Sequence, residues 1–352
     1  MAQAQPVSAP MEAAGARRGI FASLAFYVRA YGELGKLRLN AMVVVTTALG
    51  FVVGAYSIYP TVIDVRRLLW TCLGTFLAAI GASAFNQAIE GPRDARMKRT
   101  LRRPVPSGRV SRAHAAYVGL LATIAGVAIL CPTSNGLTAI LALVNVILYA
   151  AVYTPLKPRS TTNTLVGAVV GGIPPVMGWT AATGAISLGA IALGILLFAW
   201  QIPHFLALAW MYKEDYARGG YKMVSTADPD GKRTGLLSVI YSLALIPPSI
   251  ALVFFGHASP VFGGIALLLA AWMAFNALRF AADRTVRDAR RLFLTSIAYL
   301  PLLSLALVLC VRTPVIAMLQ SADGGLVSPD VHGNGANGGA PVIDPDITKA
   351  AP

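Results

Sequence analysis

The sequence predicts an all-α polytopic membrane protein with nine transmembrane helices. Hydrophobic residues make up 56% of the 352-residue chain and charged residues only 12%. The mean hydropathy is +0.65, which is far from the balance of an ordinary soluble domain. Nine stretches approach the roughly 20 apolar residues that a helix needs to cross the hydrocarbon core. Period-two alternation is lacking in the sequence, so a membrane β-barrel is disfavoured.

Each expected span is a mostly apolar run between polar segments. In chain order the spans are 39–59, 68–90, 113–131, 137–153, 164–182, 186–210, 236–255, 260–280 and 292–311. Pro174-Pro175 and Pro247-Pro248 fall inside two of them, which a bundle tolerates because neighbouring helices satisfy the freed backbone groups. We expect residues 1–35 to form an N-terminal lead, 36–312 the membrane domain, and 313–352 a disordered tail rich in Gly, Pro, Asn and Asp.

Lys and Arg collect on one side of this arrangement. The N-terminal segment and the second, fourth, sixth and eighth loops hold 25 of the 29. The positive-inside bias therefore predicts a cytoplasmic N-terminus and an external C-terminus. We expect the bacterial inner membrane rather than the mitochondrial inner membrane. Topology accounts for the net charge of +14, so no nucleic acid is expected as a partner, although the same charge could also hold an anionic substrate.

Three oxygen-bearing side chains close the second span in the stretch NQAIEGPRD. Asn86, Glu90 and Asp94 are spaced at i, i+4 and i+8, so an unbroken helix presents them on one face. Pro92 cannot donate to Ala88, and we expect a break there that swings Asp94 out toward the loop. Such oxygen ligands suit Mg²⁺, which takes one or two carboxylates and completes its shell with water and substrate phosphates.

The basic run after Asp94 has two interpretations. It is either the positive-inside signal alone, beside a solvated helix end, or a set of groups that bind phosphate directly. A second acidic cluster, Glu214-Asp215, follows the sixth span and is expected on the same side of the membrane. Two acidic clusters among basic residues favour an enzyme that holds a diphosphate through metal ions.

Several long motifs carry a family resemblance. NxxxExxxD followed by MxRTxxRPxPSG resembles the first aspartate-rich motif of the UbiA superfamily of intramembrane prenyltransferases, and in particular of its haem-farnesylating branch. Residues 153–184, 200–223 and 289–303 resemble that branch as well, and the looser GELGKLRLNAMVV lies near the N-terminus. The resemblance covers about Gly32 to Val311 and implies a UbiA-type bundle. The usual second DxxxD motif is replaced by Glu214-Asp215.

The resemblance implies a reaction and its partners. A farnesyl group passes from farnesyl diphosphate to a vinyl group of haem b, water is added, and haem o and diphosphate result; haem b is thus a substrate and Mg²⁺ the cofactor. Asn86, Glu90 and Asp94 match the metal-diphosphate motif. Residues expected to contact the diphosphate are Lys36, Arg38, Arg99, Arg102, Arg103 and Lys157. Membrane lipid surrounds the protein, and haem A synthase and cytochrome oxidase assembly proteins are candidate partners.

His204 lies inside an apolar span, where an ionisable side chain is a functional candidate. It is interpreted as an axial ligand of haem iron, against the alternative of a helix-packing histidine. A quinone-pathway prenyltransferase with an aromatic acceptor is the main alternative function, and the Glu of NxxxExxxD and the segment IPHF disfavour it. A transporter is disfavoured because the charges collect at one interface. A haem-carrying assembly factor without catalytic activity is the third alternative.

Overall fold

The helical membrane fold is confirmed by the structure, a computed structural model that describes residues 20–58 and 63–312. Within these residues nine helical spans are long and apolar enough to cross a membrane, and each one overlaps a span expected from the sequence. The first part of the expected lead, residues 1–19, and the expected disordered tail lie outside the described residues.

Thirteen α-helices and one π-helix make up the described chain. In chain order they are α2 (Ile20–Leu34), α3 (Leu37–Tyr56), α4 (Val65–Asp94), α5 (Arg112–Thr133), α6 (Gly136–Ile147), η1 (Leu148–Tyr153), α7 (Thr154–Leu156), α8 (Asn163–Thr183), α9 (Leu188–Met211), α10 (Lys213–Arg218), α11 (Lys232–Leu243), α12 (Ile246–Phe254), α13 (Pro260–Asp283) and α14 (Val286–Leu309). One span joins α6, η1 and α7, and another joins α11 and α12.

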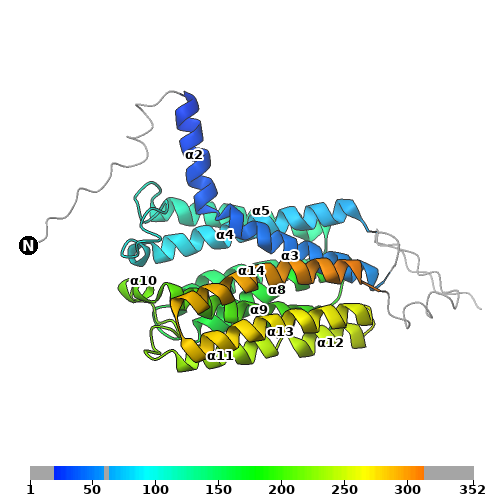
Figure 1. Cartoon of the computed structure of the whole chain (residues 1–352). Coiled ribbons are helices and arrows are strands. Elements are labelled where there is room, and N and C mark those ends of the chain that lie inside the picture. Colours follow the sequence, from blue (N-terminus) through cyan, green and yellow to red (C-terminus); the bar gives the residue numbers. More distant parts are fainter. Residues whose placement is uncertain (1–19, 59–62, 313–352) are drawn as a thin grey trace, which may run out of the picture.

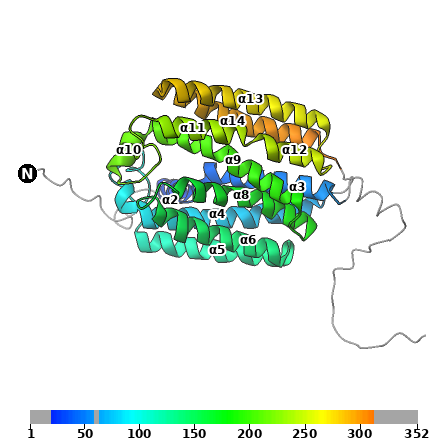
Figure 2. The same cartoon turned by 90° about the horizontal axis from the view of Figure 1, so that it is seen from below.

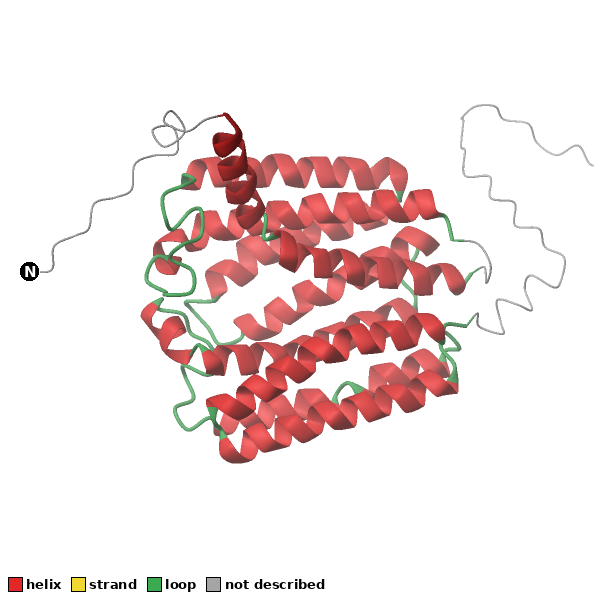
Figure 3. Cartoon of the chain, turned by 45° about the horizontal axis from the view of Figure 1, so that its top comes forward, coloured by secondary structure: helices red, strands yellow, loops and turns green. Residues whose placement is uncertain are grey.

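The spans lie side by side along a common direction, joined by short loops (Figures 1 and 3). Helix α10 and the loop between α4 and α5 lie at one end of the bundle, and α2 leaves that same end at an angle (Figures 1 and 2). We call it the basic end, because Lys36, Lys157 and the basic residues of 93–112 lie there.

Glycines allow α3 and α8 to cross closely. A Cβ atom on Gly50 would overlap the backbone of Pro175, and one on Gly178 would overlap the carbonyl oxygen of Thr47. Small residues at such crossings let helix backbones approach, which is a main source of packing energy inside a membrane. At the basic-end start of α3, Lys36 donates to Asn86 of α4 at 2.6 Å and to Tyr149 of η1 at 3.4 Å.

The expected break at Pro92 is wrong. Helix α4 continues through Pro92 to Asp94, and Asp94 is buried rather than swung out. Pro92 leaves the carbonyl of Ala88 without its helical donor. Arg112 supplies the missing hydrogen bond from Nε to this carbonyl oxygen at 2.8 Å. A neighbouring side chain thus keeps the last turn of α4 intact, and Asp94 remains on the face of Asn86 and Glu90.

Helix α2 lies within the segment expected as an N-terminal lead, for which no helix was predicted from the sequence. Its C-terminal carbonyls at Glu33 and Leu34 accept hydrogen bonds from Nε2 of Gln87 at 2.9 and 3.0 Å. Tyr31 Oη lies 2.7 Å from Nε2 of His114 on α5. These contacts fix the end of α2 against α4 and α5 and so set the position of the turn that carries Lys36.

The buried apolar side chains form two main clusters, with a cavity between them. One cluster is centred on α9, α12, α13 and α14, and the other on α4, α5, α6 and α8. A cavity of about 580 Å³ is lined by residues of α3, α4, α6, η1, α8, α9 and α14, and Arg99 and Arg103 of the α4–α5 loop close it at the basic end. We call it the central cavity.

Candidate active site

The three oxygen-bearing residues of the α4 motif lie together beside the central cavity. Asn86, Glu90 and Asp94 are on successive turns of α4 and are 0%, 4% and 2% exposed. Two carboxylates this deeply buried require cationic or metal partners, because an unpaired buried charge is very costly. Their side chains supply one amide oxygen and two carboxylates from a single helix face.

Each of the three has a basic partner from a different part of the chain. Lys36 Nζ donates to Asn86 Oδ1 at 2.6 Å. Lys157 Nζ lies 2.8 Å from Glu90 Oε1, and a guanidinium nitrogen of Arg103 lies 2.6 Å from Asp94 Oδ2. The fold therefore assembles three cations, distant in sequence, on one acidic face.

The surroundings shift the pKa of two of these cations in opposite directions. Burial, with Arg103 and Lys157 nearby, lowers the pKa of Lys36 to about 7. Burial also opposes charge on Lys157, but the Glu90 carboxylate outweighs it and raises the pKa of Lys157 well above its usual value. Lys157 is therefore held charged by its partner.

Hydroxyl groups that sequence reasoning did not single out complete the polar site. Thr154 Oγ1 accepts from Asn86 Nδ2 at 3.0 Å, and Tyr221 Oη donates to Asp94 Oδ1 at 3.3 Å. Lys157 Nζ lies 4.6 Å from the ring centre of Tyr153, within cation–π range. Tyr153 is the last residue of the π-helix η1, and the widened turn is typical of functional sites. In the sequence, the only indication of this part of the site is the pair Tyr153 and Lys157, which lie one helical turn apart.

The cavity changes from polar to apolar with distance from the basic end. Lys36 and Arg103 line its polar mouth. The remaining walls are largely aliphatic and aromatic and include Val43, Val170 and Leu300. Such a cavity can hold an anionic group at the mouth and an apolar chain inside.

His204 lines the apolar part of the same cavity. Its ring stacks with Phe293 at 4.7 Å and with Trp200 at 5.4 Å, measured between ring centres. Ser296 Oγ lies 2.8 Å from His204 Nδ1 and itself donates to the carbonyl of Phe293 at 2.6 Å. A hydroxyl that donates to a carbonyl can only accept from the imidazole. Nδ1 of His204 therefore carries the proton, and in the neutral ring Nε2 keeps its lone pair.

The second acidic cluster does not join the first. Asp215 is buried, accepts from the backbone N–H groups of Lys98 and Arg99 at 3.2 and 3.1 Å, and pairs with Arg218. Although burial opposes ionisation, these hydrogen bonds lower the pKa of Asp215 below its usual value. Glu214 is exposed. Asp215 thus holds the α4–α5 loop to α10 rather than facing Asn86, Glu90 and Asp94.

The remaining basic candidates divide into those that reach the cavity and those that do not. Arg99 lines the central cavity, donates to Tyr216 Oη at 3.0 Å and lies over the ring of Tyr212 at 4.7 Å. Arg38 and Arg102 are exposed and do not line the cavity. Arg38, Arg99 and Arg102 were all expected at the diphosphate because they lie near the motifs in the sequence. The direction of the side chain in the folded protein decides which of them reaches the cavity.

The oxygen atoms of Asn86, Glu90 and Asp94 can be compared with the ligands that different metal ions require. Among the described residues no cluster of three or more His, Cys, Asp and Glu side chains occurs. A zinc-type site made by protein ligands alone is therefore not found in this part of the chain. Two carboxylates with one amide oxygen, next to cations that can bind phosphate, fit the partial protein shell that Mg²⁺ uses together with water and phosphate oxygens.

Two curated relatives match most of the chain. It is 42% identical over 283 residues to the mitochondrial protoheme IX farnesyltransferase of Arabidopsis thaliana, covering 80% of this chain and 65% of that protein. It is 40% identical over 281 residues to the protoheme IX farnesyltransferase of Solibacter usitatus, covering 78% of this chain and 96% of that protein. The chain thus spans less than two thirds of the Arabidopsis protein but nearly all of the bacterial one.

Solved structures share the fold at low sequence identity. A UbiA homologue from Aeropyrum pernix has a TM-score of 0.61 and 18% identity, covering 76% of this chain and 98% of that one. A UbiA homologue from Archaeoglobus fulgidus bound to GPP and Mg²⁺ has a TM-score of 0.55 and 15% identity, covering 79% and 99%. The model of the UbiA prenyltransferase family matches residues 43–300. With the helical bundle and its polar-mouthed cavity, these matches establish that the chain belongs to the UbiA prenyltransferase family.

Proposed function

We propose that this chain transfers a farnesyl group from farnesyl diphosphate to a vinyl group of haem b, with addition of water, to give haem o and diphosphate. The names of the relatives at 40% and 42% identity support this acceptor. The single observation that carries it is the central cavity, whose polar mouth is lined by Lys36 and Arg103, the partners of Asn86 and Asp94, and whose apolar wall holds His204.

The donor site is proposed at the mouth of the cavity. Asn86, Glu90 and Asp94 would hold Mg²⁺, as their oxygen-rich donor set allows. When bound, Mg²⁺ supplies positive charge that favours departure of the diphosphate. The Archaeoglobus homologue bound to GPP and Mg²⁺ is consistent with a metal-diphosphate site in this fold.

The cations at the mouth of the cavity, and Lys157 beside Tyr153 of its wall, act on the leaving group. Lys36, Arg103 and Lys157 donate to diphosphate oxygens, and the bond between the farnesyl C1 carbon and oxygen breaks with its electron pair on the diphosphate. The allylic cation that remains must be kept from water until it reacts. Apolar walls that include Val43 and Val170 exclude water from this part of the cavity.

The acceptor is proposed beside His204, whose Nε2 lone pair would bind the haem iron and hold the macrocycle in place. The vinyl double bond attacks farnesyl C1, and a carbon–carbon bond forms. The positive charge then lies on the vinyl carbon next to the pyrrole ring. Water adds its oxygen there and loses a proton, which leaves the hydroxyl group of the product.

We further infer that the basic end faces the cytoplasm, in the bacterial inner membrane, as the distribution of Lys and Arg favours. Labelling of single cysteines in a background without Cys72, Cys131 and Cys310 tests this orientation. Arg102→Cys should react only with membrane-permeant reagents, and Ala185→Cys, at the other end, should also react with impermeant ones. The reverse pattern would contradict the orientation.

Purified protein in detergent with Mg²⁺ and farnesyl diphosphate tests the choice of acceptor. With equal amounts of haem b and 4-hydroxybenzoate, we expect prenylated haem alone, and in water labelled with ¹⁸O its new hydroxyl should carry the label. Prenylated 4-hydroxybenzoate as the main product would replace this proposal by the quinone-pathway alternative.

A further inference from the structure

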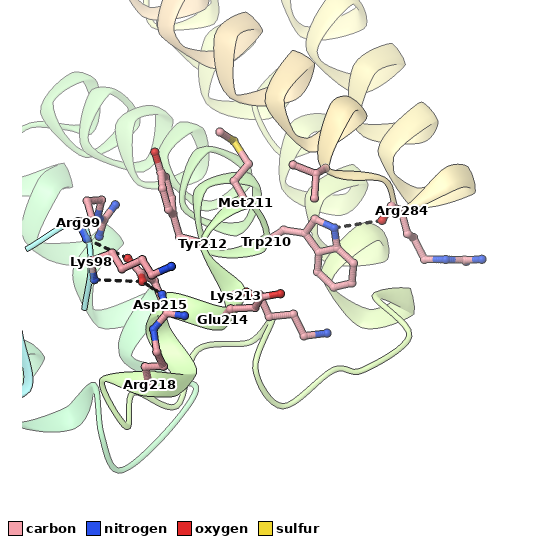
Figure 4. A pocket seen from close by; sticks show the side chains of 11 residues that line it. Lys98, Arg99, Trp210, Met211, Tyr212, Lys213, Glu214, Asp215, Arg218 and Arg284 are labelled. Carbon is pink, nitrogen blue, oxygen red and sulfur yellow. Dashed lines mark hydrogen bonds and ion pairs between the residues drawn. The ribbon is translucent and has the colours of Figure 1, made fainter. Parts of the chain in front are cut away.

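Lys36 lies in the turn between α2 and α3 with an unusual backbone. Its φ of 47° and ψ of 48° lie in the left-handed region, where glycine is favoured. Arg284 is the one other non-glycine residue with a positive φ among the residues that the structure describes, and its side chain points away from Lys98 and Arg99 (Figure 4). The ammonium group of Lys36 instead donates to Asn86 of the proposed donor site. A strained backbone that directs a side chain into a site indicates a use for the strain.

Gln87 of α4 holds the end of α2 directly before Lys36. Its Nε2 group donates to the carbonyl oxygens of Glu33 and Leu34 at 2.9 and 3.0 Å, so both of its N–H bonds are used. These carbonyls belong to the last turn of α2, where the helix no longer supplies donors. The Gln87 side chain is fully buried, and its Oε1 atom has no hydrogen-bond partner in the described part of the chain. Because an unpaired buried acceptor is costly, the two donors are the reason for an amide here.

Asn40 of α3 holds the same turn from the other side. Its Nδ2 group donates to the Gly35 carbonyl at 2.6 Å and to Ser83 Oγ at 3.2 Å. Ser83 lies one helical turn before Gln87 on α4, so two points of α4 hold the turn. The carbonyl of Lys36 itself accepts from the backbone N–H of Asn40 at 3.0 Å. We call the side chains of Asn40, Ser83 and Gln87 the amide clamp.

Neighbouring residues of α4 hold the side chain and the backbone of Lys36 separately. Asn86 accepts from the Lys36 ammonium group at 2.6 Å, whereas Gln87 binds the backbone before Lys36. Lys36 lines the central cavity, but Gln87 does not. In the proposed reaction the ammonium group would pass from Asn86 to the diphosphate while the clamp keeps the backbone in place. Only the side chain of Lys36 would then have to move, which limits the entropy lost on binding.

We infer that the amide clamp positions Lys36 for binding of the diphosphate, with Gln87 as its main positioning residue, and this inference rests on the proposed function. The clamp holds the left-handed backbone, and the backbone sets the direction in which the Lys36 side chain leaves the chain. The ammonium group is thereby held at the mouth of the cavity before the substrate binds. Gln87 thus contributes to diphosphate binding without contacting the substrate.

A double-mutant cycle tests the inference. Gln87→Met keeps the side chain at about the same length and removes both donors, and Lys36→Met removes the ammonium group. Calorimetry in detergent with Mg²⁺ would measure the binding of farnesyl thiodiphosphate, an unreactive analogue of the donor. Each single substitution should weaken binding by about tenfold, as expected for loss of a charge-assisted contact. The double variant should bind no more weakly than Lys36→Met, because Gln87 acts through Lys36.

Thermal unfolding separates positioning from a general loss of stability. Gln87→Met should lower the unfolding temperature equally in the wild-type and Lys36→Met backgrounds, although its effect on affinity appears only in the first. Asn135 provides the matched control, because its amide donates to the carbonyl of Thr180 at 2.7 Å at the opposite end of the bundle. Asn135→Leu should lower the unfolding temperature and leave the affinity for the analogue unchanged. If Gln87→Met does not fold, Asn40→Leu takes its place in the cycle, with the same expected coupling.

The possible outcomes separate this inference from the proposed function. Loss of affinity through Gln87→Met in both backgrounds, or in neither, would overturn the inference. Failure of the wild type to bind the analogue would contradict the proposed donor site and overturn the inference with it. Coupling between Gln87 and Lys36, together with farnesyl transfer to an acceptor other than haem b, would support the inference and contradict only the proposed acceptor.

Discussion

Asp94 illustrates how the site balances buried charge. Its carboxylate is 2% exposed and contacts Arg103 and Tyr221, so it is stabilised from two sides. In the proposed reaction the same oxygens would hold Mg²⁺, and Arg103 would be free to bind the diphosphate. A charge that is compensated in both states can remain buried without unfolding the helix end.

Replacement of Asp94 by Asn tests the role of its carboxylate in farnesyl transfer. The carboxamide keeps the size and still accepts a hydrogen bond from Arg103, so the protein should insert and fold. Farnesyl transfer should fall by about a hundredfold or more, since a charged group that acts on the developing charge is lost. Turnover at limiting Mg²⁺ measures this, with the exposed Glu214→Gln as the control. Wild-type activity in Asp94→Asn would place the diphosphate site elsewhere.

Substitutions of His204 and Ser296 are predicted to weaken the binding of haem b. His204→Ala should abolish the absorption change on addition of haem b, and Ser296→Ala should weaken haem binding by about tenfold, as seen for groups that orient a metal ligand. Ser296→Thr, which keeps the hydroxyl, should restore it. His114→Ala is the control, because His114 lies at the start of α5, away from the cavity. An unchanged spectrum in His204→Ala would make His204 a packing residue.

At the level of elements, the loop between α4 and α5 is held by Asp215 of α10. Asp215→Ala leaves two backbone N–H groups and Arg218 without their acceptor and should cost about 1 to 3 kcal/mol of stability. Thermal unfolding in detergent at neutral pH measures this, and the neighbouring Glu214→Ala should change little. Equal effects of the two substitutions would contradict the structural role of Asp215.

The pH dependence of this contact has a definite sign. The pKa of Asp215 is lower in the folded protein than its usual value. Its contribution is therefore present at neutral pH and disappears as the pH falls below about 4, where the unfolded chain takes up the proton first. Asp215→Ala should remove that part of the acid sensitivity.

The sequence predicted the elements better than their contacts. Apolar length alone located all nine spans, because burial in a membrane imposes that length. The spacing of Asn86, Glu90 and Asp94 predicted their common face, but Pro92 suggested a break that Arg112 prevents by binding the Ala88 carbonyl. Such a contact joins residues that are 24 positions apart and depends on tertiary packing.

The partners of the site residues were less predictable for the same reason. Ser296 lies 92 positions from His204 and carries no motif of its own. Glu214 and Asp215 were expected beside the first acidic motif because of their charge, yet Asp215 is used by the α4–α5 loop. Charge and topology predict which end of the bundle a residue occupies, whereas its neighbours follow only from the folded chain.

On the scale of the whole molecule, two packed groups of helices enclose one cavity, and the cations gather at its mouth. This arrangement separates a polar site for leaving-group departure from an apolar site for carbon–carbon bond formation. It also gives a use to part of the positive charge that this chain, with a net charge of +14, carries at its basic end.

The central claim is that donor and acceptor react within this cavity to make farnesylated haem. The most direct measurement is the mass of the haems extracted from a host that makes haem b but no haem o. Expression of the wild-type chain should yield a more hydrophobic haem, heavier than haem b by one farnesyl group and one hydroxyl group, and Asp94→Asn should yield none. Recovery of haem b alone, from membranes that contain the folded wild-type protein, would contradict the account.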